Sequence, residues 1–143
     1  INALIEQTKV EPTLGETENY RIMNWEQVCS LDNHHLFTIG GHSMYHNILG
    51  NLSEADAKAE IEGSISLIKQ KTGTDQRHYA YPEGQPHHYT EHTIKILKNN
   101  GIICCPSAFP GVNSVSDNLF HLRRIIVRMF SLPFPFTDRR LTT

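Results

Sequence analysis

Residues 36–46 read Leu-Phe-Thr-Ile-Gly-Gly-His-Ser-Met-Tyr-His and contain the strongest signals for fold and chemistry in this chain. The apolar run Leu36–Ile39 ends at two glycines, which is typical of a buried strand. His42 and His46 follow four residues apart, so a helical turn starting here would direct both imidazoles to one point. Two imidazoles in that arrangement can hold a divalent metal, most often zinc. The alternative interpretation is that the spacing of His42 and His46 arises by chance, because the chain contains nine histidines.

Helix and strand patterns alternate on the C-terminal side of this stretch. One helix is expected to begin after the N-cap Ser53 and to end at Gly73, and a second is expected over residues 90–101. Buried strands are expected at residues 78–81, 102–105 and 125–127. Because strands and helices alternate, the strands should be parallel and joined by right-handed crossovers. The predicted fold class is therefore α/β.

The N-terminal side predicts two shorter helices on either side of a polar loop. Residues 1–9 place apolar side chains on one helical face, and residues 10–20 have the composition of a loop. Asn24 and Gln27 form a capping-box pattern at the start of the next helix. The side chains expected to face inward from that helix are Trp25, Val28 and Cys29. These N-terminal elements carry no chemical motif of their own.

The composition bounds the class of protein. A chain of 143 residues fits one domain, and 38% hydrophobic with 20% charged residues argues against disorder. A formal net charge of −2 lacks the basic footprint of a nucleic-acid binder, and no apolar run approaches the length of a membrane span. Three cysteines, of which Cys104 and Cys105 are adjacent, predict no disulfide framework and favour a reducing compartment such as the cytoplasm. The tail Pro133–Phe136 should pack over the surface or against a neighbour.

A second stretch with chemical potential is Tyr-Ala-Tyr-Pro-Glu-Gly at residues 79–84, where another expected strand ends. A Pro-x-Gly exit can turn backbone N–H groups towards a pocket, as an oxyanion site requires. An ordinary strand-terminating turn is the simpler alternative. Three aromatic residues near the strand ends are either sugar-stacking rings or core side chains, namely Tyr79, Tyr81 and Phe109.

Taken together, the two stretches resemble the polysaccharide deacetylase family, also known as the NodB-homology domain or carbohydrate esterase family 4. The second motif of that family reads His-Ser/Thr-x-x-His at the end of a barrel strand, and one branch writes its third motif Phe-Ala-Tyr-Pro-x-Gly. The resemblance covers residues 23–127 in the expected order. It implies that residues 1–143 form a single domain of a distorted (β/α) barrel, incomplete at its N-terminus.

The resemblance also implies roles for individual residues. His42 and His46 would be two ligands of a divalent metal, zinc or a similar ion, and Ser43 would hydrogen-bond to steady the loop that holds His46. The backbone N–H of Glu83 would stabilise a tetrahedral oxyanion. The remaining residues would line the substrate groove: Tyr79, Ala80, Tyr81, Pro82, Gly84 and His88.

The implied reaction is removal of an N-acetyl or O-acetyl group from a polysaccharide or oligosaccharide by a metal-dependent hydrolase. Three alternatives stand beside it: a catalytically inactive carbohydrate-binding relative, a hydrolase of the same fold acting on a small non-sugar amide, and a scaffold in which the histidine pair is structural. A shallow open groove would favour a polymer substrate, and a closed pocket a small molecule.

Several parts of the family pattern are absent from the sequence. The first motif, Thr-Phe-Asp-Asp-Gly, should supply the catalytic base and a third metal ligand, and neither the Asp-Trp motif nor the Leu-x-His motif of the general acid is found. Ala80 stands where many relatives carry Arg, and His88 is the one candidate for a replacement ligand or acid. Because the chain opens at Ile1, the first strand is expected to be missing. An open barrel edge would then favour a homodimer.

Overall fold

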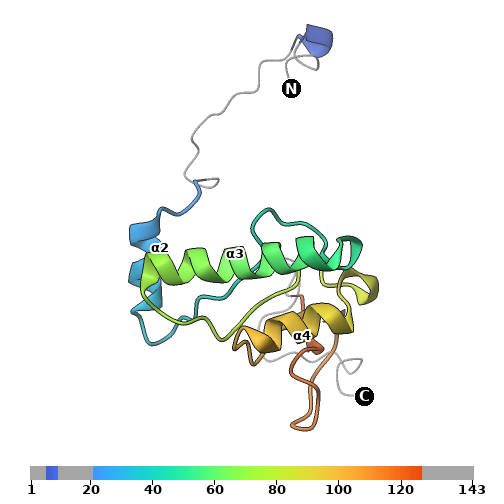
Figure 1. The fold of residues 1–143 in the computed structure, drawn as a ribbon. Helices are drawn as coiled ribbons and strands as arrows, with labels where there is room; N and C mark the ends of the chain where they lie inside the picture. Colours follow the sequence, from blue (N-terminus) through green and yellow to red (C-terminus); the bar gives the residue numbers. More distant parts are fainter. Residues whose placement is uncertain (1–5, 10–20, 127–143) are drawn as a thin grey trace.

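The computed structural model describes residues 6–9 and 21–126 (Figure 1). Residues 6–8 are helical, in agreement with the helix expected near the N-terminus. The expected loop over residues 10–20, the end of the last expected strand at Val127 and the tail Pro133–Phe136 lie outside the described residues.

Parallel backbone pairing forms the inner layer of the fold. Gly41 pairs with Tyr79 in an isolated parallel bridge, and His78 pairs in the same way with Cys104. The chain then continues into β1 (Pro106–Pro110), which pairs in parallel with β2 (Leu122–Arg124). The paired segments are therefore neighbours in the order in which they occur along the chain. This arrangement confirms the parallel α/β class expected from the sequence.

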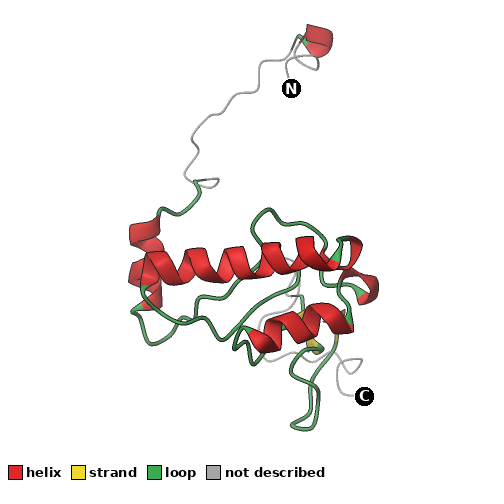
Figure 2. Ribbon diagram, viewed as in Figure 1, coloured by secondary structure: helices red, strands yellow, loops and turns green. Residues whose placement is uncertain are grey.

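Two helices connect these segments and lie side by side in Figures 1 and 2. α3 (Glu54–Thr72) begins at the N-cap Ser53 and ends at Gly73, whose φ of 78° is left-handed, so both expected ends are confirmed. α4 (Glu91–Asn99) begins at the N-cap Thr90 and is followed by Gly101. Two short 3₁₀ turns precede the helices, η2 (Leu49–Asn51) and η3 (Pro86–His88).

α2 (Trp25–Asp32) packs against α3, and its capping box is present as expected. The Asn24 N–H donates to Gln27 Oε1 and the Gln27 N–H donates to Asn24 Oδ1, each at 2.9 Å. The expected inward face is only partly formed, because no residue of α2 is buried and Trp25 is 39% exposed. Cys29 makes a polar contact with α3, where its thiol donates to the Lys71 carbonyl at 3.3 Å.

The core lies between the parallel layer and the helices. Tyr81 is 1% exposed, stacks on Tyr89 with ring centroids 3.8 Å apart, and donates its hydroxyl to the Phe120 carbonyl at 3.1 Å. Ile61 of α3 and Leu97 of α4 are both fully buried beside them. Such burial removes apolar surface from water and stabilises the fold by roughly 1.5–3 kcal/mol for each large side chain.

Two strand predictions are wrong in detail. Leu36 and Phe37 are 73% and 52% exposed, so the run expected to be a buried strand is an exposed, unpaired segment that meets the layer only at Gly41. The last strand lies at residues 122–124, before the expected 125–127, and Ile126 is 72% exposed. Residues 78–81 and 102–105 are extended, but each contributes isolated bridges only. A segment pairs into a strand only where a neighbouring backbone supplies partners, which apolar composition does not reveal.

The buried thiol and phenol predict a loss of stability at alkaline pH. Burial raises the pKa of Cys105 from 9.0 to about 12 and that of Tyr79 from 10.0 to about 12. Both groups stay protonated in the folded chain and ionise on unfolding at high pH. Their contribution is therefore complete below pH 9 and is lost as the pH rises from 9 towards about 12. Urea denaturation at a series of pH values measures the fall in the free energy of unfolding.

A Cys105→Ala variant is the control for this prediction. Its free energy of unfolding should fall less steeply between pH 9 and 10, because the variant lacks the Cys105 thiol, which ionises in unfolded chains over that interval. A wild-type stability that stays constant to about pH 11 would contradict the assignment.

Candidate metal centre

His42 and His46 lie together in the loop that follows Gly41. Their ring centroids are 4.9 Å apart and the ring planes are inclined by 74°, and both residues are exposed. The loop is not the helical turn expected from the spacing. Ser43 and His46 instead have left-handed backbone angles, with φ of 64° and 59°. These two reversals bring the imidazoles close without a helix, at an energetic cost that the surrounding contacts must offset.

The His42 ring is oriented by the neighbouring segment of the parallel layer. Its Nδ1 lies 2.8 Å from the carbonyl oxygen of Ala80. A carbonyl only accepts hydrogen bonds, so Nδ1 must carry the proton of the neutral ring. Nε2 then keeps a free lone pair, which is the form of imidazole that binds a metal. Ala80 therefore acts through its backbone oxygen.

Tyr79 holds the other side of the loop. The Ser43 N–H donates to the Tyr79 hydroxyl at 2.7 Å. Ser64 Oγ donates its hydrogen to the Ile61 carbonyl at 2.9 Å and lies 3.4 Å from the same tyrosine hydroxyl, so the phenol donates to Ser64. Burial raises the pKa of Tyr79 to about 12, which keeps this donor protonated at neutral pH. The phenol thus joins the loop to α3.

Ser43, which the resemblance expected to hydrogen-bond and steady the loop, makes a hydrogen bond through its backbone N–H. Its backbone N–H makes the bond to Tyr79, whereas its side-chain Oγ is buried and has no hydrogen-bond partner within the described residues.

Glu60 is a functional candidate that the sequence reasoning missed. It is 7% exposed on the buried face of α3, and it accepts hydrogen bonds from the N–H groups of Met44 and Tyr45 and from the Asn47 amide. Burial raises the pKa of this carboxyl, but the hydrogen bonds outweigh burial and hold the pKa below its usual range. A signal was present in the sequence, because a glutamate between Ala57 and Ile61 interrupts an apolar helix face.

The second stretch forms a tight turn around Glu83. The Gly84 N–H donates to the Pro82 carbonyl at 2.6 Å, and Glu83 at the centre of this three-residue turn has a φ of 60°. Gly84 is required here, since a Cβ atom would lie 2.8 Å from the Ala108 nitrogen. Among the hydrogen bonds of the described residues, none uses the N–H of Glu83, and the residue is exposed. That N–H is available to a ligand.

The other groove candidates are mostly buried. Tyr79 and Tyr81 are 2% and 1% exposed, so their rings are core side chains, which was the alternative to sugar stacking. Pro82 and Gly84 are also buried, and Ala80 is partly exposed. His88 is partly exposed in η3, where its Nδ1 accepts the Gln85 N–H at 3.2 Å.

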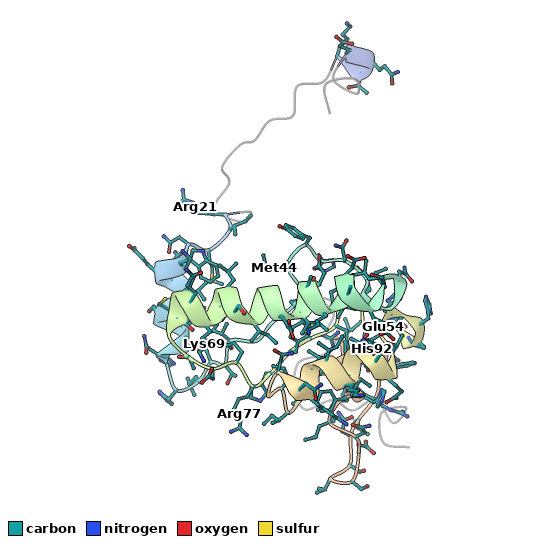
Figure 3. The ribbon with its side chains drawn as sticks, in the orientation of Figure 1. Arg21, Met44, Glu54, Lys69, Arg77 and His92 are labelled. Atoms are coloured by element: carbon teal, nitrogen blue, oxygen red, sulfur yellow. The ribbon has the colours of Figure 1, made fainter. Side chains whose placement is uncertain are left out.

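The donors present match two positions of a zinc site. Neutral imidazole nitrogens are common zinc ligands. Across residues 6–9 and 21–126, no three His, Cys, Asp or Glu side chains gather closely enough to hold a metal ion. His88 therefore does not complete the pair in this structure. The further histidines lie elsewhere, for example His92 beside Glu54, with a His92 Nδ1 to Glu54 Oε1 distance of 3.4 Å (Figure 3).

Comparison with known families gives the context for this geometry. Residues 2–104 match the family described as Polysaccharide deacetylase. The chain belongs to the polysaccharide deacetylase family. No curated protein matches the chain significantly. Among the described helices, none is both long and apolar enough to cross a membrane.

Solved structures of deacetylases share the fold at low sequence identity. IcaB from Ammonifex degensii has a TM-score of 0.68 and 20% identity, and the match covers 90% of this chain and 61% of that one. The deacetylase PplD of Streptococcus pyogenes, solved with acetate, has a TM-score of 0.66 and 19% identity, covering 74% and 45% of the two chains. The BpsB deacetylase domain of Bordetella bronchiseptica has a TM-score of 0.65 and 19% identity, covering 82% and 53%. This member of the polysaccharide deacetylase family thus spans about half the length of those proteins.

The contact between His42 and Ala80 predicts a single ring tautomer. At a pH at which histidines are neutral, His42 should carry its proton on Nδ1, because the Ala80 carbonyl at 2.8 Å requires a donor. Two-dimensional ¹⁵N NMR of the imidazole nitrogens distinguishes the two tautomers. The exposed His35 is the comparison and should show the mixture typical of a solvated ring. An Nε2–H tautomer at His42 would contradict the assigned orientation.

Proposed function

We propose that this chain is part of a divalent-metal-dependent deacetylase that removes N-acetyl or O-acetyl groups from a polysaccharide or oligosaccharide. The observation that carries the proposal is the pairing of His42 and His46, with the lone pair of His42 Nε2 left free by the Ala80 carbonyl. Zinc or a similar ion fits these donors. We also propose that the parallel layer is part of a distorted (β/α) barrel, since its segments are neighbours in chain order.

The chemistry divides between the ion and the residues of this chain. A bound divalent ion would supply Lewis acidity to a water molecule and to the acetyl carbonyl. His42 and His46 would hold it, and Ala80 O would keep His42 in the ligating tautomer. The free N–H of Glu83 would donate to the oxygen on which negative charge develops. The tight turn fixes the direction of that donor before substrate arrives.

Exposure of the two imidazoles favours a polymeric substrate. Both His42 and His46 are exposed, so the candidate centre opens at the surface and is not enclosed in a small-molecule pocket. A polysaccharide can lie across such a surface, whereas a small amide gains its affinity from burial in a concave site. Carbohydrate is therefore the substrate class proposed here, in keeping with the family.

Zinc binding by the purified chain tests the proposal. We expect zinc to co-purify or to bind on titration, and we expect His42→Ala and His46→Ala each to weaken it by roughly tenfold or more, because each removes one ligand. Inductively coupled plasma mass spectrometry and a chelator-competition titration measure this. Release of acetate from N-acetylglucosamine oligomers, with and without zinc, then measures activity.

His35→Ala is the matched control, since this exposed histidine lies outside the pair. It should bind zinc as the wild type does. Equal zinc binding by all four proteins would show that the metal is held elsewhere and would overturn the proposed centre. Zinc binding that is lost in the two histidine variants, together with zinc-dependent acetate release, would support the proposed deacetylase.

A further inference from the structure

The carboxylate of Glu60 is the most unusual buried group in the described structure. It lies on α3, it is 7% exposed, and no cation pairs with it within the described residues. Burying a charge is costly unless hydrogen bonds compensate for the lost water. An apolar residue would pack at this helix position without that cost. The charge is therefore explained by what it contacts.

Its contacts are concentrated on the loop that carries the histidine pair. One carboxylate oxygen accepts the backbone N–H groups of Met44 at 2.9 Å and Tyr45 at 3.1 Å. The other oxygen accepts the Asn47 side-chain amide at 2.8 Å. His46 lies between Tyr45 and Asn47, so Glu60 contacts the residues on both sides of a candidate ligand.

The loop needs such a support. His46 has a φ of 59° and Ser43 a φ of 64°, and non-glycine residues adopt this region only where other contacts hold them. Apolar packing gives limited help, because a cleft of about 260 Å³ opens between the loop and α3, with Glu60 in its lining. Met44 does pack against α3, since a Cβ at Gly63 would lie 2.9 Å from its Cγ (Figure 3). Hydrogen bonds supply the rest.

We propose that Glu60 is a positioning residue, whose carboxylate holds loop 43–47 in the conformation that presents His46 beside His42. The inference rests on the proposed function for the statement that the two imidazoles bind a metal. The loop-holding part stands on the contacts alone. One oxygen accepts the two backbone N–H groups and the other accepts the Asn47 amide, and ionised acceptors form stronger hydrogen bonds than neutral ones. Groups that orient metal ligands typically alter metal affinity about 10- to 100-fold when removed.

Three variants test the assignment in the purified chain. Glu60→Ala removes all three acceptor bonds. Glu60→Gln keeps one oxygen, which can still accept both backbone N–H groups. Glu62→Ala is the matched control, because Glu62 is a nearby carboxylate of α3 that contacts Asn100 and Lys58 and not the loop. Circular dichroism at a temperature where each variant is folded ensures that binding is compared among folded proteins.

Zinc affinity and the absorption spectrum of bound Co²⁺ are the readouts of ligand geometry. We expect Glu60→Ala to bind zinc about 10- to 100-fold more weakly, with an altered Co²⁺ spectrum, and Glu60→Gln to recover most of the affinity. Glu62→Ala should behave as the wild type. A Glu60→Ala affinity within about twofold of wild type, alongside loss of binding in His42→Ala, would overturn the positioning role and leave the proposed function intact.

Amide hydrogen exchange separates failure of this inference from failure of the proposed function. The Met44 and Tyr45 amides donate directly to Glu60, so Glu60→Ala should speed their exchange in the metal-free chain at least tenfold, and Glu62→Ala should not. If the wild type binds no metal, faster exchange would still support the loop-holding role. Unchanged exchange at both amides would overturn it in every case.

Discussion

The candidate centre depends on the backbone pairing between Gly41 and the segment at 78–80. The Gly41 N–H donates to the His78 carbonyl at 3.1 Å, and the Ala80 N–H donates to the Gly41 carbonyl at 2.9 Å. No side chain fits at position 41, because a Cβ would lie 2.6 Å from the Tyr79 ring. Two residues beyond His78, the Ala80 carbonyl is the one that contacts His42 Nδ1. The tautomer of a proposed metal ligand thus follows from the register of two backbone segments.

The loop beyond His42 is held between two supports of different chemistry. On one side is the buried phenol of Tyr79, which is neutral and belongs to the parallel layer. On the other is the carboxylate of Glu60, which belongs to α3. Both accept hydrogen bonds from backbone N–H groups of the loop. The amides of a segment with two left-handed residues, which makes no regular helix or sheet hydrogen bonds, find partners in these two side chains.

Local rules predicted the parts of the structure that depend on neighbouring residues in the chain. The caps at Asn24, Ser53 and Gly73 are where the sequence places them, because a cap is decided within about four residues. The alternation of elements also predicted parallel pairing. The run at Leu36 and Phe37 was misassigned, since composition alone cannot show whether another segment supplies partners on either side.

The site was predictable to a similar extent. The histidine spacing identified the pair, and the resemblance to polysaccharide deacetylases placed it in a family that residues 2–104 match. The burial of Tyr81 and the hydrogen bond from the Ser43 N–H to the Tyr79 hydroxyl depend on packing between distant segments. Glu60 was missed because its three donors lie 13 to 16 residues away in a loop whose shape only the folded chain defines.

Contact between Glu60 and the loop also links binding to the stability of a helix. Any ligand that prefers the loop conformation favoured by Glu60 must, by reciprocity, strengthen the contacts that Glu60 makes from α3. Under the proposed function, occupation of the candidate site would extend its effect inwards to the turn of α3 around Ile61, which is fully buried. Local opening of α3 would then weaken ligand binding, and ligand binding would make local opening of α3 less favourable.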